Sequence, residues 1–394
     1  MATFLLIIGL FLFVGLIVVH EFGHFIAARR NGVDVEEFAI FFGPSIYSRV
    51  TKAGWRFRIN TIPLGGYVKL KGEHDSDTEP GSYGAASLWV KTKIMSAGVI
   101  MNVITALVIL TIIGFIGLPQ IFPGQFTIKS NQHQVSKPTD YVQVENVIKG
   151  SPASKSSLKS GDEILSLGTK GDMVKINNFT QLQTATEKFA GKKVTIDYQR
   201  HGADNTTAVT LNTKSYVSKQ TSPQKKVYLG VELATYQSGV NLVRYTWASP
   251  IVAAGITKQV TVLTYEGLGR ALSGLGGIIA GVATNNTAER VHAQTTASSQ
   301  LTGPVGIFFI LRAGSAIGFQ YMLFIIAIIS LALALMNILP LPALDGGRLW
   351  ATLVTRLFKR PLSAHAEEVY NAVGMLVLLL LFVVITYVDI KRFL

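Results

Sequence analysis

This sequence has no cysteine and few charged residues. Without cysteine the chain has no disulfide, no thiolate zinc ligand and no thiol nucleophile, and its redox compartment stays undetermined. Charged residues make up 15% of the 394 residues and hydrophobic residues 49%, more apolar than ordinary soluble domains. The net charge of +13 comes from scattered Lys and Arg, without a basic helix or an aromatic-basic stripe. Nucleic acid is therefore not expected as a partner, whereas a lipid bilayer with anionic headgroups is.

Long apolar runs divide the chain into membrane spans and polar parts. Residues 3–19 lack the basic start and the cleavage site of a signal peptide, so we predict a retained transmembrane helix over 1–30. Further spans are predicted at 94–118, within 319–346 and at 369–388. The loop 31–93 and the loop between the last two spans are rich in Lys and Arg, which places both in the cytoplasm. The termini and the long insertion then lie outside.

The insertion differs in character from the spans. Within 126–233, alternating segments such as 141–144 and 193–198 predict strands separated by Gly, Asn and Lys, and so a small soluble domain. In 239–300 a mixed segment precedes a polar linker at 285–300. Its apolar residues are interrupted by charges, which predicts an amphipathic helix on the outer membrane surface and leaves an additional span open.

The first span ends in three ionisable residues, His20, Glu21 and His24. Positions four apart lie on one face of a helix, so the two imidazoles can bind one metal ion with Glu21 beside them. In this arrangement a glutamate takes a proton from the attacking water and passes it to the leaving amine. Two buried histidines satisfied by neighbours are the alternative. Three ionisable groups inside a membrane helix cost on the order of several kcal/mol before pairing, which favours a functional cluster.

A catalytic zinc usually has three protein ligands, so a third ligand must come from elsewhere. Asp345 is the candidate, because it follows the third span on the same side of the membrane as the end of the first span. Alternatively it begins a turn or caps the next helix, which Asp-Gly often does. The rival ligands on that side lie in a polar loop, at Glu73, His74, Asp75 and Asp77.

These motifs match a known family. H-E-F-G-H at 20–24 and N-I-L-P-L-P-A-L-D-G-G at 337–347 resemble the zinc motif and the aspartate element of the bacterial site-2 protease family, of the regulator of sigma-E protease type. The resemblance covers nearly the whole chain. It implies a zinc cofactor, the metal ligands His20, His24 and Asp345, and catalysis by Glu21.

The resemblance also extends to residues expected near the substrate. G-V-I-M-N at 98–102 is similar to an element whose asparagine lies near the active site, which implies Asn102. Asn337 would bind the substrate backbone, unless it only ends a helix before Pro340. Two positions depart from the family pattern, with Val99 in place of a common proline and Arg348 in place of a frequent histidine.

I-P-L-G-G-Y-V-K-L at 62–70 resembles a re-entrant β-hairpin that dips into the membrane near the active site, within the cytoplasmic loop 31–93. A helical peptide bond is protected from attack, and an edge strand can extend the substrate by strand addition. The resemblance therefore implies substrate contacts at Gly65, Gly66 and Tyr67. An ordinary glycine turn is the alternative.

In the insertion, G-S-P-A at 150–153, L-K-S-G-D-E-I-L at 158–165 and Y-L-G-V at 228–231 resemble a circularly permuted PDZ domain. Such a domain binds peptide C-termini by strand addition, or keeps bulky ectodomains away from the membrane entrance. L-T-G-P-V-G-I at 301–307 is similar to another family motif, to which we assign no chemistry.

Together these patterns predict a polytopic α-helical membrane protein with about four transmembrane helices, a cytoplasmic-side membrane-associated β-hairpin and one extracytoplasmic α+β PDZ domain. The implied function is that of an intramembrane zinc metalloendopeptidase of the bacterial cytoplasmic membrane, acting in regulated intramembrane proteolysis. Its expected substrates are single-span membrane proteins, such as anti-sigma factors, and signal-peptide remnants. An inactive PDZ scaffold would keep the fold without needing Glu21. A metal transporter would carry ligands at several depths, whereas here they gather at one end of a span.

Overall fold

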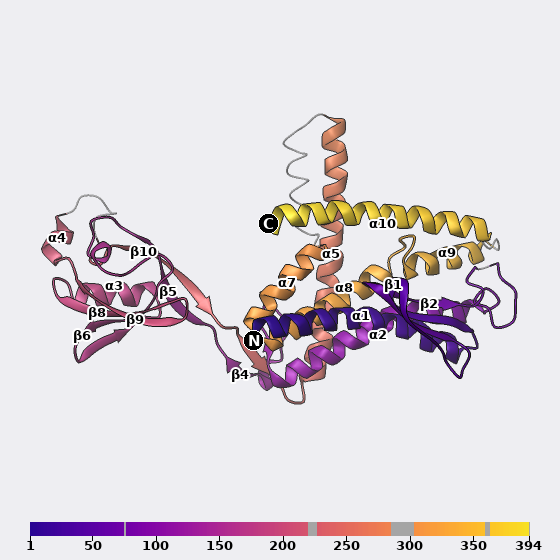
Figure 1. Cartoon of the computed structure of the whole chain (residues 1–394), viewed down its shortest axis with the longest axis horizontal. Helices are drawn as coiled ribbons and strands as arrows, with labels where there is room; N and C mark the ends of the chain where they lie inside the picture. Colours follow the sequence, from indigo (N-terminus) through magenta and orange to yellow (C-terminus); the bar gives the residue numbers. More distant parts are fainter. Residues whose placement is uncertain (75, 220–226, 285–302, 359–362, 394) are drawn as a thin grey trace. The chain divides into compact units, whose positions relative to one another are not determined.

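The computed structural model describes residues 1–74, 76–219, 227–284, 303–358 and 363–393 (Figure 1). The chain forms two compact units, one of residues 1–135 with 242–394 and the other of residues 136–241. The first unit is mainly helical and the second is rich in strands. The polar linker predicted at 285–300 and the start of the 301–307 motif lie outside the described residues.

The first unit contains seven described α-helices: α1 (Ala2–Arg30), α2 (Leu88–Ile116), α5 (Ser249–Ala283), α7 (Pro304–Ile317), α8 (Phe319–Asn337), α9 (Asp345–Leu357) and α10 (Ala364–Phe393). Of the described helices, α1, α2, α8 and α10 are long and apolar enough to cross a membrane. The predicted number of four spans is thereby confirmed. The helix α2 begins six residues before the predicted start, and α10 extends five residues beyond the predicted span at each end.

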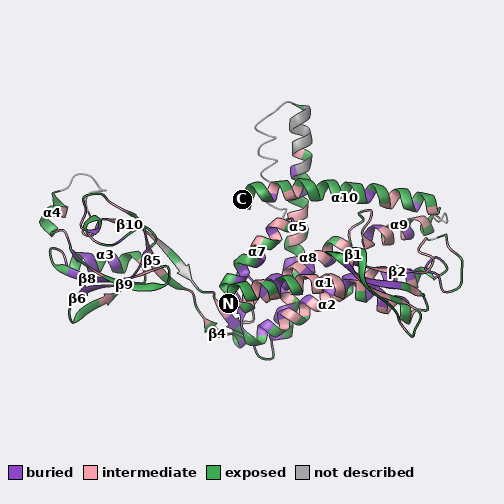
Figure 2. Ribbon diagram, in the orientation of Figure 1, coloured by how far each residue is buried: buried purple, intermediate pink, exposed green. Residues whose placement is uncertain are grey.

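The spans α1, α2 and α8 pack side by side and form the core of this unit (Figure 1). Small residues allow the close approach: a Cβ added to Gly9 of α1 would lie 2.3 Å from the Met322 sulfur of α8. The helix α10 exposes most of its apolar side chains (Figure 2), as expected for a span that faces lipid. At one end, the buried Asp389 carboxylate of α10 accepts hydrogen bonds from Gly303 N and Gly306 N, at the start of α7.

The segment 239–284 forms strand β11 (Leu242–Arg244) and the 35-residue helix α5. Buried side chains near the start of α5, including Val252, Ile256 and Val260, pack in one cluster with α2 and α8. The helix α5 is not among the four candidate spans of the described residues. Strand β11 lies between β3 (Leu118–Pro119) and β4 (His133–Ser136) in a three-stranded sheet.

The loop between α1 and α2 folds into a sheet of β1 (Val35–Val50) and β2 (Arg56–Leu70). Phe38 of β1 pairs with both Phe57 and Val68 of β2, so β2 bends back on itself. Phe57 also pairs with Arg49, so β1 bends as well. The bends fall at Gly43 (φ 86°) and Gly65 (φ 77°), where a left-handed backbone favours glycine. The hairpin predicted at 62–70 is thus one part of a larger sheet.

The register gives this sheet four segments, in the order 66–70, 35–42, 56–62 and 45–50. Segment 66–70 is an edge of the sheet, and strand β2 contacts α1. Phe38 packs against Phe22 and Phe25 of α1, so one face of the sheet is fixed to the helix that carries the H-E-x-x-H motif.

The second unit contains a six-stranded sheet with the order β10-β5-β6-β8-β9, and β7 paired to β6. Its elements are β5 (Thr139–Val147), β6 (Glu163–Thr169), β7 (Asp172–Lys175), β8 (Lys193–Arg200), β9 (Ala203–Thr210), β10 (Val231–Ser238), α3 (Phe179–Lys188) and α4 (Lys214–Ser218). The unit starts ten residues later than predicted, because 126–135 packs with the helical unit, where Phe126 N donates to Gln259. It ends later because β10 pairs with β5 as far as Ser238.

The second unit has a hydrophobic core of its own, to which Ile164, Leu167 and Ile196 contribute fully buried side chains. We expect Leu167→Ala to destabilise a fragment of residues 136–241 by about 2–5 kcal/mol, because truncating a fully buried leucine leaves a cavity. Urea unfolding followed by circular dichroism measures the difference. Met173→Ala, at an exposed position on β7, is the control; equal effects of the two changes would contradict the described core.

Candidate metal centre

Three ligand atoms from distant parts of the chain meet beside α1. His20 Nε2 lies 2.9 Å and His24 Nε2 lies 3.0 Å from Asp345 Oδ2, and the two imidazole nitrogens are 3.3 Å apart. Both histidines are buried and Asp345 is partly buried. Among the described residues, this is the one group of three or more such side chains that could hold a metal ion. Two imidazoles and a carboxylate are a donor set that suits zinc.

The helix α2 positions both imidazoles. Gly98 faces them directly, since a Cβ added there would lie 2.4 Å from His24 Nε2 and 2.7 Å from His20 Nε2. His24 Nδ1 donates to the Ile94 carbonyl oxygen at 2.7 Å, which leaves Nε2 of a neutral ring free to bind a cation. The pattern G-V-I-M-N thus places a glycine against the rings and Asn102 one turn further along the same helix.

Asn102 supplies an independent test of whether a cation fits. Its amide nitrogen lies 3.3 Å from His20 Nδ1, while its buried oxygen has no hydrogen-bond partner among the described residues. A neutral His20 that binds a cation through Nε2 carries its proton on Nδ1. If the side-chain amide of Asn102 is rotated so that its oxygen and nitrogen exchange places, the oxygen accepts a hydrogen bond from His20 Nδ1–H. A cation bound at His20 Nε2 therefore gives the Asn102 oxygen the partner that it lacks.

Asp345 supplies the carboxylate of the cluster, and its Oδ2 atom lies within 3.0 Å of both imidazole Nε2 atoms. The rival residues make other interactions. The Glu73 carboxylate accepts a hydrogen bond from Leu70 N, and the Asp77 carboxylate accepts one from His74 N. The fourth rival, Asp75, lies outside the described residues.

A tight turn between α8 and α9 brings Asp345 to the histidines. Added Cβ atoms at Gly346 and Gly347 would lie 2.3 Å from Leu339 O and 2.0 Å from Leu341 O, so neither position has room for a side chain. Close packing against the preceding backbone therefore explains why both residues after the aspartate are glycines. Asp345 is the first residue of α9, one position after the N-cap residue Leu344, and it belongs to the cluster.

The helix α10 packs against this turn and against the start of α9. Arg348 pairs with Glu367 of α10 at 3.4 Å and also donates to the Glu73 carbonyl oxygen. Its guanidinium lies 5.1 Å from the Tyr83 ring centroid. Further along α10, a Cβ at Gly374 would lie 2.2 Å from Pro342. Arg348, at the position where the family often has histidine, thus joins α9 to α10 and to the loop between α1 and α2.

A cavity of about 220 Å³ opens beside the cluster. Most residues predicted to take part in catalysis or to bind substrate line it, together with two of the ligands: His20, Glu21, Gly65, Gly66, Asn102, Asn337 and Asp345. Glu21 interacts with the Val68 backbone N–H, and a Cβ at Gly66 would lie 3.3 Å from Glu21 Cγ. The edge segment 66–70 therefore runs directly past the glutamate.

Tyr67 is the exception among the predicted substrate contacts. It does not line the cavity, and its hydroxyl donates to Glu37, which also pairs with Arg58. Successive residues of a strand point to opposite faces, so the Tyr67 side chain faces away from the cavity that Gly66 lines. Phe42, which no sequence pattern indicated, lines the cavity and stacks on Tyr67.

A glutamate beside a His-His-Asp cluster, in a protein whose described residues include four candidate spans, defines a membrane metalloprotease. The chain belongs to Peptidase family M50, whose model matches residues 8–381. Members of this family are zinc-dependent, so the cofactor is zinc, as predicted.

The chain is similar to proteins from several bacteria that are named provisionally as zinc metalloproteases. It is 30% identical to one of Clostridium perfringens (strain 13 / Type A), with 98% of each chain covered. It is also 30% identical to one of Campylobacter jejuni, covering 96% of this chain and 90% of the relative. A protein of Vibrio cholerae is 28% identical, with 96% of each chain covered.

The contact between Gly98 and the imidazoles gives a test of the site geometry. We expect Gly98→Ala to lower zinc affinity at least about tenfold, because the added methyl forces the two rings apart. Zinc retained after dialysis against a chelator measures this. Gly15→Ala on α1, where no atom lies within 4 Å of the added Cβ, should retain zinc like the wild type; equal retention by both variants would refute the contact.

The α10 contact gives a second test. We expect Arg348→Met to weaken zinc binding about tenfold, because the turn that carries Asp345 loses its tie to Glu367 and leaves that buried carboxylate without this partner. The double variant Arg348→Glu with Glu367→Arg should recover part of the affinity, measured by competition with a zinc-binding dye. Arg356→Met, at an exposed position of the same helix, serves as the control.

Proposed function

We propose that this membrane metalloprotease is an intramembrane zinc endopeptidase that cleaves peptide bonds within the membrane segments of single-span proteins, including anti-sigma factors and signal-peptide remnants. One observation carries the proposal. The His20, His24 and Asp345 cluster opens into a cavity that also holds Glu21 and is bordered by the edge of a β-sheet. Metal ligands, a proton-transfer group and a peptide-extending edge thus meet at one end of the spans.

Zinc held by His20, His24 and Asp345 supplies a Lewis acid that acidifies water and polarises the scissile carbonyl. Glu21 is placed to accept a proton from the attacking water and to deliver it to the leaving nitrogen. Glu21 lines the cavity and does not belong to the ligand cluster, so its carboxylate need not bind the metal and can make this transfer. The buried amide of Asn102 orients His20 from the opposite side.

The substrate must be extended before cleavage, since a helical backbone hides its amides. Segment 66–70 has one partner in its sheet, and its first residue, Gly66, lines the cavity together with the preceding Gly65. We infer that the substrate adds as a strand along this edge, with the scissile bond near Glu21. Asn337, at the end of α8 and in the cavity wall, offers donor and acceptor groups to the extended backbone.

The basic loops favour a site that opens to the cytoplasm in the bacterial cell membrane, with the strand-rich unit outside. We propose that this unit is a PDZ domain. Its β10 forms a sheet edge, follows Gly230 (φ 85°) and contacts α3, an arrangement that suits strand addition by a peptide C-terminus. Cleavage after removal of a substrate's outer part would make this regulated intramembrane proteolysis.

Glu21→Gln tests the role of the base. We expect cleavage of a tagged single-span substrate in vesicles to fall about 10²–10⁴-fold, with zinc content unchanged, because the variant loses proton transfer and keeps the ligands. His20→Ala, His24→Ala and Asp345→Ala should lose bound zinc. Equal cleavage by Glu21→Gln and wild type would favour a scaffold over an enzyme. Zinc retained by Asp345→Ala would remove the third ligand.

A further inference from the structure

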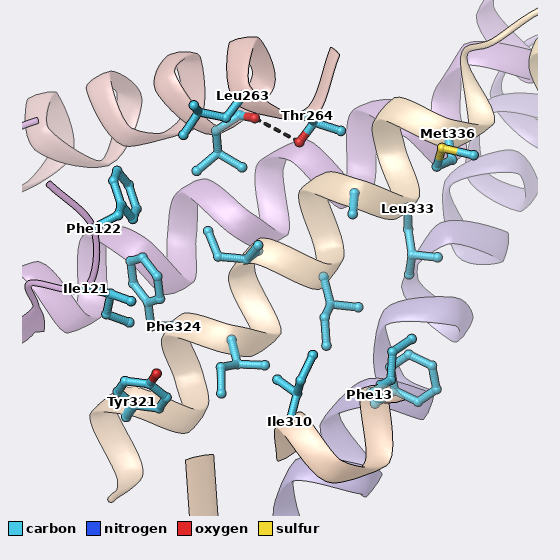
Figure 3. A pocket seen from close by; sticks show the side chains of 16 residues that line it. Phe13, Ile121, Phe122, Leu263, Thr264, Ile310, Tyr321, Phe324, Leu333 and Met336 are labelled. Carbon is cyan, nitrogen blue, oxygen red and sulfur yellow. Dashed lines mark hydrogen bonds between the residues drawn. The ribbon is translucent and has the colours of Figure 1, made fainter. Parts of the chain in front are cut away.

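A second and larger cavity, the α8 groove, lies along α8 (Figure 3). Its volume is about 620 Å³. Fifteen of its sixteen lining residues are apolar or aromatic, and the sixteenth is Thr264, whose hydroxyl donates to the Val260 carbonyl oxygen. Such a lining selects an apolar occupant.

Four helices and one loop build the α8 groove. The helix α8 forms its floor from Tyr321 to Met336, α5 and Phe122 lie along one side, and α7 and Phe13 of α1 lie along the other (Figure 3). The groove therefore runs lengthwise along a predicted span. The helical rise between these two residues gives it a length of about 22 Å, or about four turns.

The α8 groove leads to the ligand cluster. Leu333 lines both cavities, and Asn337, one turn further along α8, lines the cavity beside the metal ligands. On α1 the same continuity holds, since Phe13 lines the groove while Ile17 and His20 line the cavity, at spacings of one helical turn. A molecule lying in the groove thus points one end at Glu21.

We propose that the α8 groove docks the still-helical part of the substrate's membrane segment, next to the stretch that unfolds at the zinc site; this rests on the proposed function. A helix about 22 Å long and about 10 Å wide occupies on the order of 1,700 Å³. The groove holds about a third of that volume, so it accepts the side chains of one face of a helix. Large apolar residues spaced three and four apart on the substrate would fill it.

Substrate selection then depends on α8 residues outside the ligand cluster. Ala332 is the small residue of the groove floor, in a lining otherwise made of large side chains and Thr264. A larger side chain at this position would fill the space meant for a substrate side chain. The exposed Ala372 of α10 lines neither cavity and provides a matched position for the same change.

Photo-crosslinking tests the docking without requiring cleavage. The probe is a single-span peptide in vesicles, with a leucine-rich segment of about 20 residues and one Asn-Gly pair near its cytoplasmic end. A photoreactive residue at Ile310 should crosslink to this peptide, and one at the exposed Val373 of α10 should not. Adding Ala332→Phe should reduce the Ile310 crosslink about tenfold. Crosslinks from Ile310 to lipid alone, or equal peptide crosslinks from both positions, would overturn the proposal.

Cleavage of the same peptide separates docking from a folding defect. Ala332→Phe should lower kcat/KM about tenfold with zinc content unchanged, because the new ring clashes with the bound helix, and Ala372→Phe should have no effect. In a series of peptides with single Leu→Ala changes, at least one should recover cleavage by Ala332→Phe. A uniform loss across the whole series would overturn the proposal. If wild type crosslinks the peptide but cleaves none, the proposed function fails instead.

Discussion

Three ionisable groups share one point between membrane helices, and the packing around them follows from that constraint. Two imidazoles and a carboxylate within about 3 Å of one another are costly to bury unless a cation joins them. The histidines and the aspartate are therefore positioned by different contacts. The histidines are fixed by backbone and amide groups of α2, while Asp345 is fixed by a glycine-lined turn backed by α10.

This arrangement explains the distribution of small residues better than helix propensity does. Gly98 lies where a methyl group would meet the imidazoles, and Gly346 and Gly347 lie where side chains would meet the chain ahead of them. Gly374 gives α10 close access to Pro342. These glycines cost helix stability, yet each allows the approach of a segment that orients a ligand. The ion pair between Arg348 and Glu367 also joins α9 to α10.

The spans and the histidine pair could be predicted because their signals are local. A long apolar run and an i, i+4 spacing can each be seen within one segment. Asp345 required a second argument, from membrane depth and family resemblance, because its own neighbourhood also fits a helix cap. The doubled sheet of β1 and β2 could not be predicted, since its bends depend on pairing between residues far apart, such as Phe38 with Val68. Tyr67 was placed on the substrate side for the same reason: alternation along the strand became clear only once the register was known.

The partners of Arg348 and the lining of the α8 groove were also beyond sequence reasoning. A lone arginine after an aspartate motif gives no indication that a glutamate 19 residues later will face it. The groove is formed by four helices and a loop, and each contributes ordinary apolar residues that would suit any buried or lipid-facing position. These contacts form only when the helices pack, so no single segment of the sequence indicates them.

The separation of the ligands along the chain has a consequence for biosynthesis. His20 is made 325 residues before Asp345, with two other spans and the whole strand-rich unit between them. A nascent chain that has inserted its first helix carries two histidines and the glutamate but cannot yet assemble a complete centre. The ligand set is therefore complete only after α8 and the turn that follows it have been synthesised.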